Sequence, residues 1–286
     1  MIVGWIGRAG AIIVGTMFLA TACAPGRACH PETNVQLPDE RKVLGAVTNG
    51  QAGRDLAAAI FAGDADDVRR RLTRDPQLAS THVPPVAYPD FAPDGQFGDL
   101  LTFAVARCDG SMLDTLLALK VPPAIQGDAL TLAIATRAHD LAEKLLAAGA
   151  DANGGKGSPR VPPLVTAAEH EDVDAANLLL RHGADPNARD GADITVLQTV
   201  VDADSMQVAE ALIAHGGDPW AVSAGGAIPA RGIWEPLRIG SPAEEAARQR
   251  LIAKLQRKGA PWPPPDPKQV SAMVRDGAWP PAGLKP

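Results

Sequence analysis

The chain has 286 residues, of which 46% are hydrophobic and 4% aromatic, and its formal net charge at pH 7 is −6. It contains no run of basic residues interleaved with aromatic ones, so no stretch of the sequence is suited to follow a phosphate backbone. The composition therefore argues against a nucleic-acid partner.

The first 22 residues have the pattern of a signal peptide. Arg8 is the only charged residue before Cys23, and an apolar stretch follows it over residues 9–20. A basic start, a short apolar stretch and small residues at the end predict a segment that is removed on secretion. The apolar stretch is too short to cross a membrane comfortably, since that takes about 20 residues. Removal of the segment leaves 26 basic and 33 acidic side chains, a net charge of −7.

The three residues before Cys23, Ala-Thr-Ala, resemble the end of the lipobox of bacterial lipoproteins, in which cleavage leaves a lipidated cysteine as the new N-terminus. That motif prefers a leucine three residues before the cysteine, whereas Leu19 lies four before it. The resemblance implies a lipid on Cys23. Ala24 stands where an aspartate would retain a lipoprotein at the inner membrane, so the resemblance implies an outer-membrane anchor facing the periplasm. An ordinary secretory signal, cut near Ala22 or Ala24, is the alternative.

Residues 23–52 are rich in Pro, Gly, Asn and charge and predict a flexible tether, which would hold the fold roughly 30 Å from its anchor. Cys29 lies in this tether and Cys108 in the region beyond it. In an oxidising compartment the two thiols could form a disulfide that fixes the tether to the fold. The alternative is two unpaired cysteines, one of them a small core residue.

One pattern occurs three times between residues 127 and 224. In each set of equivalent residues the copies are 34 and 33 residues apart. The sets are Leu130, Leu164 and Leu197; Gly149, Gly183 and Gly216; and Asp151, Asp185 and Asp218. Three landmarks that keep one period predict a repeat architecture.

Within one period the sequence predicts two helices joined by a loop. The first helix carries small residues that allow close packing, namely Ala133, Ala167, Ala168 and Val200. The second helix has apolar residues at helical spacing, as at Val173, Ala176, Leu179 and Leu180. A glycine then follows in each copy, where a left-handed residue is needed to end the helix.

This period and the motif Leu-Leu…Gly-Ala-Asp-x-Asn resemble the ankyrin repeat, and the stretch from Pro163 to Ala168 resembles its Thr-Pro-Leu-His-x-Ala start. Thr131, Val165 and Gln198 occupy the site of the family's histidine, which implies looser contacts between repeats. The resemblance implies an all-α fold, an ankyrin-repeat solenoid of stacked helix–loop–helix units.

The predicted organisation has four parts. They are a lipoprotein signal peptide (1–22), the tether (23–52), an ankyrin-repeat domain (53–262) and a Pro-rich C-terminal segment with a short capping helix (263–286). The domain divides into degenerate units at 53–98 and 99–126, clear units at 127–160, 161–190 and 191–224, and a distorted unit at 225–262. In the unit 99–126, Pro122-Pro123 stand where the Gly-Ala-Asp turn is expected.

No motif for catalysis, a metal or a cofactor stands out. The six histidines pair with no nucleophile motif, no Cys or His cluster has zinc spacing, and the glycines at 154–157 lack the flanks of a phosphate loop. We therefore expect no enzyme, no cofactor and no small-molecule substrate.

A solenoid does supply an extended concave surface. In the ankyrin family partners usually bind there, and Trp and Arg are enriched at binding hot spots. The predicted contact residues are therefore Arg160, Arg189 and Trp220 in the loops between units, with the aromatic loop residues Tyr88, Phe91 and Phe97 as a second candidate surface. Trp220 could instead pack under residues 221–235.

The leading functional hypothesis is a monomeric, membrane-tethered module of the bacterial envelope that binds or neutralises a partner protein. The alternatives are an accessory protein in oxidative-stress defence, a purely structural envelope protein, and a hydrolase built on the loop insertions.

Overall fold

The structure is a computed structural model. It describes residues 39–84, 98–121, 128–154, 162–190, 192–257, 261–281 and residue 284. Within these ranges the chain is helical, and the only bridges between extended residues are two isolated ones, His82 with Asp99 and Arg189 with Thr195. The all-α fold class predicted from the sequence is confirmed.

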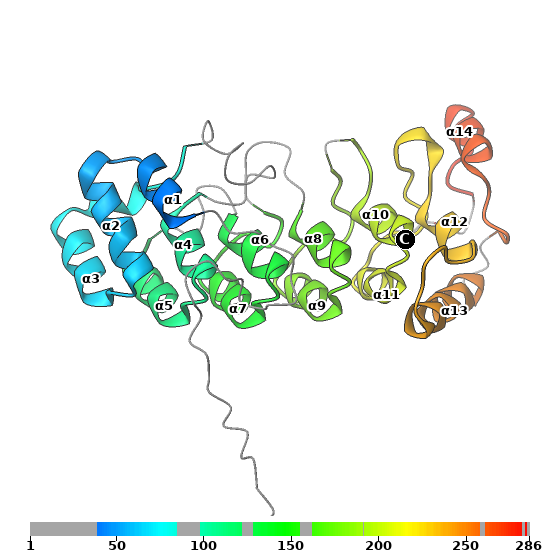
Figure 1. The fold of residues 1–286 in the computed structure, drawn as a ribbon. Coiled ribbons are helices and arrows are strands. Elements are labelled where there is room, and N and C mark those ends of the chain that lie inside the picture. The colour runs from blue at the N-terminus through cyan, green and yellow to red at the C-terminus, as the bar shows by residue number, and fades with distance from the viewer. Residues whose placement is uncertain are drawn as a thin grey trace, which may run out of the picture.

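Most of the helices form six pairs, stacked side by side in two rows (Figure 1). The first helices of the pairs are α2 (Gly50–Ala62), α4 (Leu100–Ala106), α6 (Asp128–Ala135), α8 (Pro163–Glu169), α10 (Val196–Asp202) and α12 (Pro229–Trp234). The second helices are α3 (Ala65–Arg74), α5 (Gly110–Ala118), α7 (His139–Ala147), α9 (Val173–Arg181), α11 (Met206–Ala214) and α13 (Pro242–Arg257). The six pairs follow the order of the six units expected from the sequence, although α2 begins at Gly50, before the expected start of the first unit at residue 53.

Two further helices lie at the ends of the stack, α1 (Glu40–Ala46) and α14 (Pro267–Arg275) (Figure 1). Short 3₁₀ turns, η1 (Pro76–Ser80) and η3 (Ala224–Gly226), follow α3 and precede α12. No helix in the described part of the chain has both the length and the apolar character needed to cross a bilayer.

The stack depends on small side chains in the first helices. Every helix of this row packs against its counterparts in the neighbouring pairs. The predicted close-packing residues are all buried, with exposed fractions of 0% for Ala133, Ala167 and Val200 and 1% for Ala168. Because each pair shares its apolar surface with both neighbours, one hydrophobic core runs from Val43 to Leu284.

Within each of the first five pairs a residue in the left-handed conformation turns the chain from the first helix into the second. Gly63 fills this position in the first pair, and Cys108, Arg137, Glu171 and Asp204 fill it in the next four, with φ between 50° and 60° for these four residues. The second helices then begin with side-chain caps in three pairs, since the carboxylates of Asp64, Asp109 and Asp172 accept backbone N–H groups of the first turn.

The glycines after the second helices are left-handed, as predicted, with φ of 94° at Gly149, 87° at Gly183 and 97° at Gly216. Lys120 has the same conformation, with φ of 57°, at the equivalent point after α5. The unit 99–126 therefore makes the helix-ending turn that Pro122-Pro123 had suggested was missing, but with a residue that favours this conformation less than glycine.

The predicted tether, residues 23–52, differs from the structure in its C-terminal part. Residues 40–46 form α1, and Gly50 already begins α2. Val43 and Val47 lie one helical turn apart and are 0% and 6% exposed, so α1 contributes to the core next to α2. The tether prediction is wrong for residues 39–52, because the low hydrophobicity of the whole segment concealed this short apolar face. Residues 1–38 lie outside the described ranges.

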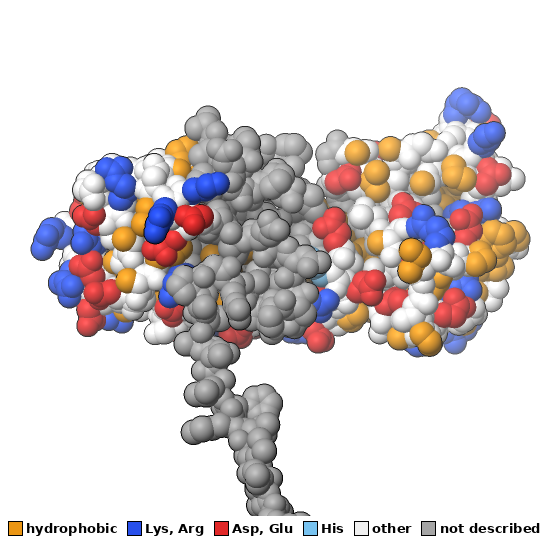
Figure 2. Space-filling model, in the orientation of Figure 1, with side chains coloured by type: hydrophobic (Ala, Val, Ile, Leu, Met, Phe, Trp, Pro, Cys, Tyr) orange, Lys and Arg blue, Asp and Glu red, His pale blue; other side chains and the backbone are white. Residues whose placement is uncertain are grey.

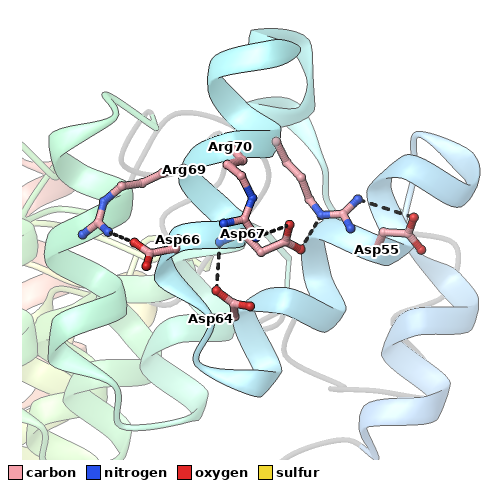
Figure 3. Close-up of polar contacts among 7 residues, drawn as sticks. Asp55, Asp64, Asp66, Asp67, Arg69 and Arg70 are labelled. Carbon is pink, nitrogen blue, oxygen red and sulfur yellow. Dashed lines mark hydrogen bonds and ion pairs between the residues drawn. The ribbon is translucent and has the colours of Figure 1, made fainter.

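The surface of the first pair is held by ion pairs along α3 (Figure 3). The Asp67 carboxylate accepts hydrogen bonds from Arg70 and Arg71, at 3.2 and 2.6 Å, and Arg71 also reaches Asp55 of α2 at 3.4 Å. The hydrogen bond from Arg71 lowers the pKa of Asp67. These contacts show that most charged residues of α3 form local pairs, within α3 or with Asp55 of α2.

The last pair departs from the pattern because a longer loop joins its helices. The buried Arg248 of α13 donates from Nη1 to the carbonyls of Ile233, Trp234 and Glu235 at 3.4, 3.1 and 3.1 Å, and so satisfies the end of α12. In this pair, the hydrogen bonds of Arg248 therefore connect α12 to α13, where the other pairs have a short left-handed turn.

The helix-ending turns lead to a stability prediction. An added Cβ at Gly183 would meet no atom within 4 Å, so the substitution Gly183→Ala is unfavourable through its positive φ alone. We expect a loss of about 1 kcal/mol in the free energy of unfolding, measured by urea denaturation. Gly45→Ala in α1 is the control, since Gly45 also has open space and has no positive φ. It should stabilise the protein by about 0.5–1 kcal/mol. A loss of similar size in both variants would contradict this reading.

Candidate binding face

The loops between α9 and α10 and between α11 and α12, in the described part of the chain, rise on the side of the first-helix row (Figure 1). We call the exposed residues of this row and of these loops the inner face. Because each pair contributes one loop and one first helix, equivalent positions recur at regular intervals along the inner face. Solenoid proteins use such a surface to bind extended partners.

Backbone contacts to Asp and Asn side chains set the shape of the loops. The carboxylates of Asp151 and Asp185 each accept the N–H of the residue two positions later, at 2.9 and 2.8 Å. Asn153 then accepts the N–H of Asp185 at 2.7 Å, and Asn187 accepts that of Asp218 at 2.8 Å. The motif Gly-Ala-Asp-x-Asn therefore ties each loop to the next one, and these side chains have a structural task.

Trp220 occupies the position of Asn153 and Asn187 in the third loop. Its backbone N–H still bonds to the carboxylate of Asp218, at 2.8 Å, but its indole is only 6% exposed and belongs to the hydrophobic core. The prediction that Trp220 is a surface contact for a partner is wrong, because the side chain is buried in the hydrophobic core. The alternative, a packing residue, is what the structure shows.

Arg189 lies on the inner face with 37% of its side chain exposed. Its Nη1 atom donates to the carbonyl of Asp193 at 3.0 Å, to the carboxylate of Asp193 at 3.2 Å and to the carbonyl of Val222 at 3.0 Å. One end of the guanidinium thus joins two neighbouring loops. Arg189 remains a predicted contact residue, but part of its hydrogen-bonding capacity is already used.

The other predicted contact residues, Arg160, Tyr88, Phe91 and Phe97, lie outside the described residues. The two ends of the aromatic loop are described and lie together. The N–H of Val83 donates to the carbonyl of Gly98 at 2.7 Å, next to the bridge between His82 and Asp99. The insertion at residues 85–97 therefore begins and ends at one point beside α4.

Cys108 stands at the left-handed turn of the second pair and is disulfide-bonded. The chain has three cysteines, and Cys23 and Cys29 lie outside the described residues. The pairing of Cys108 with Cys29 stays a prediction.

The inner face also carries three acidic residues that the sequence reading did not single out. Glu169, Asp202 and Glu235 are 33 residues apart and lie at the C-terminal ends of α8, α10 and α12. All three are exposed, and the three helices pack in this order in the first-helix row. We call them the carboxylate ladder. The repeat period itself could have revealed them, since each is the seventh residue counted from the start of its first helix.

The electrostatic environment of the ladder is uneven. Partial burial raises the pKa of Asp202, and the nearby carboxylates of Asp204 and Glu235 raise it further, whereas a hydrogen bond from Gln198 and the charge of Arg238 act in the opposite direction. Glu235 forms an ion pair with Arg231 at 2.8 Å. Glu169 forms no ion pair with any described residue. Among the described residues, the ladder thus presents Glu169 without an ion pair, Asp202 with a raised pKa, and Glu235 paired with Arg231.

The buried carboxylate of Asp172 caps a helix and connects two neighbouring pairs. Its Oδ1 atom accepts the N–H of Ala175 at 3.0 Å and so caps α9, while its Oδ2 atom lies 2.7 Å from Nε2 of His139 and 3.6 Å from Arg137. These contacts join two successive pairs. No group of three or more potential metal-binding side chains occurs among the described residues.

The position of Trp220 leads to a second prediction. Trp220→Ala should lower the free energy of unfolding by about 3–5 kcal/mol, because it removes a large buried side chain and leaves a cavity. Arg189→Ala should lower it by about 1 kcal/mol, the value of a few partly exposed hydrogen bonds. Thermal unfolding monitored by circular dichroism at 222 nm would compare the two. A Trp220→Ala protein as stable as the Arg189→Ala protein would contradict the burial of the indole.

The fold and the motif can be compared with known proteins. The family model described as Ankyrin repeat matches residues 162–191. No curated protein matches the sequence significantly. Among solved structures, 194 chains are significantly similar. One of these is the ankyrin repeat domain of Bcl-3, described as a unique member of the IkappaB protein family.

That domain is 22% identical in sequence and superimposes with a TM-score of 0.50, over 68% of this chain and 81% of the other. At this identity the similarity shows the fold alone. The stacked pairs, the left-handed turns and the bonded loops agree with it. The protein therefore has the ankyrin-repeat fold, and its residues 162–191 carry the sequence of an ankyrin repeat.

Proposed function

We propose that the protein is an exported, lipid-anchored module of the bacterial cell envelope that holds a specific partner protein on its inner face. Ankyrin repeats indicate a protein–protein interaction module. The observation that carries the proposal is the inner face, where loops and helix ends from successive pairs stand at regular intervals on one side of a firmly packed stack. Such a surface suits an extended protein partner.

Two features support export and anchoring. The first 23 residues have the charge, the short apolar stretch and the cysteine that suit a lipoprotein signal. Cys108 forms a disulfide, and disulfides persist in oxidising compartments such as the periplasm. Mapping of the linked peptides would identify the partner of Cys108, for which Cys29 is our candidate.

Within this class we favour a protein that neutralises or scaffolds one partner. An accessory role in oxidative-stress defence is the second candidate, and the same inner face would serve it. The genes beside this one distinguish the two, since a secreted effector favours neutralisation and a catalase favours the stress role. We assign the protein no catalytic step, cofactor or small-molecule substrate, and we propose that it acts as a monomer.

Lipid anchoring is tested at Cys23. The variant Cys23→Ser removes the thiol that would carry the lipid, so the protein should move from the membrane fraction to the soluble periplasmic fraction. Fractionation followed by immunoblotting measures this, and metabolic labelling with a clickable palmitate should mark the wild type and Cys29→Ser but not Cys23→Ser. Cys29→Ser is the matched control and should remain in the membrane fraction. If Cys23→Ser carries no label but stays in the membrane fraction as fully as the wild type does, a lipid on Cys23 is not what anchors the protein.

Partner binding is tested by chemical cross-linking in intact cells, followed by affinity capture from the native envelope. We expect one partner protein in stoichiometric amount, and mass spectrometry should place the cross-linked sites on the inner face. Cross-links confined to the second-helix row, or no stoichiometric partner under these conditions, would contradict the proposal and favour a structural role in the envelope.

A further inference from the structure

Negative charge is concentrated in the segment from the start of α8 to Glu235, whereas the rest of the last unit, from Arg238 to Lys258, is basic. Residues 162–235 contain 12 acidic and three basic side chains, a net charge of −9, whereas the whole chain has −6. In the view of Figure 2, basic side chains stand out at the two ends of the molecule and acidic ones prevail over the visible surface between α8 and α11. A partner on this part of the inner face meets a negative surface, which favours basic side chains.

A buried acceptor beside the ladder has no donor. Gln198 is 6% exposed, and its Nε2 atom donates to Oδ1 of Asp202 at 2.8 Å. Its Oε1 atom is fully buried and has no hydrogen-bond partner. A buried acceptor without a donor is unfavourable, and a donor that approaches Asp202 can relieve it. The Oε1 atom of Gln198 is therefore an acceptor to which no N–H group of the described residues is bound, next to Asp202, the middle carboxylate of the ladder.

The spacing of the ladder fixes the shape of the partner. Packed helices lie about 8–10 Å apart, so successive ladder carboxylates recur at about this interval. An extended peptide advances about 3.3 Å per residue, so three residues cover about 10 Å. A peptide that runs along the stack therefore brings every third side chain to an equivalent position.

From these observations we infer that the inner face binds a basic, extended segment of its partner protein, with Lys or Arg at every third residue. Glu169, Asp202 and Glu235 each bind one of these side chains. The Gln198 amide turns toward the cation at Asp202 and accepts a hydrogen bond from it. Arg231, which is already paired with Glu235, keeps that carboxylate in place. This inference rests on the proposed function of the inner face as a protein-binding surface.

The test uses synthetic peptides as probes. The first peptide has three Lys residues at every third position, separated by Ser and Thr. The second has the same composition with the three Lys adjacent, and the third has Glu in place of Lys. Fluorescence anisotropy with the mature chain at low salt measures the dissociation constants. We expect the first peptide to bind at least about tenfold more tightly than the second, and the third not to bind.

Two sets of neutral substitutions test the residues. The ladder variant, Glu169→Gln with Asp202→Asn and Glu235→Gln, should weaken binding of the first peptide at least about tenfold. The control variant makes the same change in charge on the exposed outer helices, Asp140→Asn with Glu143→Gln and Asp174→Asn, and should bind as the wild type does. Melting curves verify that both variants are folded.

The Gln198 amide is tested by the variant Gln198→Met. It should lower the affinity for the first peptide a few-fold, while the thermal stability of the free protein stays the same. An affinity equal to that of the wild type would overturn the part assigned to this amide. Raising the salt concentration from about 0.05 to 0.5 M should markedly lower the affinity for the first peptide, because salt screens the exposed carboxylates of the ladder.

The results separate this inference from the proposed function. Equal affinities of the first two peptides, or equal losses in the ladder and control variants, would overturn the inference. If the native partner is still captured by the ladder variant as well as by the wild type, the protein is a binding module whose partner does not use the ladder. Absence of any partner for the wild type would overturn the proposed function instead.

Discussion

Each helix pair of this protein has apolar surface on two sides that it cannot bury by itself. The close approach of the first helices solves this, and it depends on Ala133, Ala167, Ala168 and Val200, which are essentially inaccessible to solvent. Larger side chains at these positions would push neighbouring pairs apart. The regular stack, the single core and the even spacing of the inner face all follow from this one packing requirement.

The sequence determined most of the fold because the period is strong and its landmarks have clear physical roles. Gly149, Gly183 and Gly216 were expected to be left-handed, and they are. Helix α14 lies where a short capping helix was expected. The expectation failed for α1. This helix lies in a polar segment and is stabilised by the contact of a few apolar residues with α2, not by its local sequence.

The site was harder to predict because side-chain type alone does not show exposure. Trp220 was chosen for its chemistry, yet a residue that replaces an asparagine in a loop can turn inward if the following loop leaves space for it. The ladder was missed for the opposite reason. Glu169, Asp202 and Glu235 are ordinary surface residues one at a time, and only the stacking of α8, α10 and α12 places them in one row. Arg189 shows a third case, in which an exposed cation is partly occupied by the carbonyls of adjacent loops.

The change at Trp220 has a consequence for how the last pair is attached. No asparagine extends the loop contacts beyond Asp218, and carboxylates take over: Asp204 accepts the N–H groups of Arg238 and Ile239, Glu244 accepts two hydrogen bonds from Gln207, and Glu210 pairs with Arg250. The hydrogen bond from Arg250 lowers the pKa of Glu210, so its stabilising effect is present above the pKa of the unfolded chain and is lost as the pH falls through the folded value. Acid therefore weakens one partly exposed ion pair of the C-terminal joint, between Glu210 and Arg250, while the side chains of Asn153 and Asn187 do not titrate. The irregular end is therefore attached through side-chain carboxylates, whereas the loops of the regular repeats are tied to each other through asparagines.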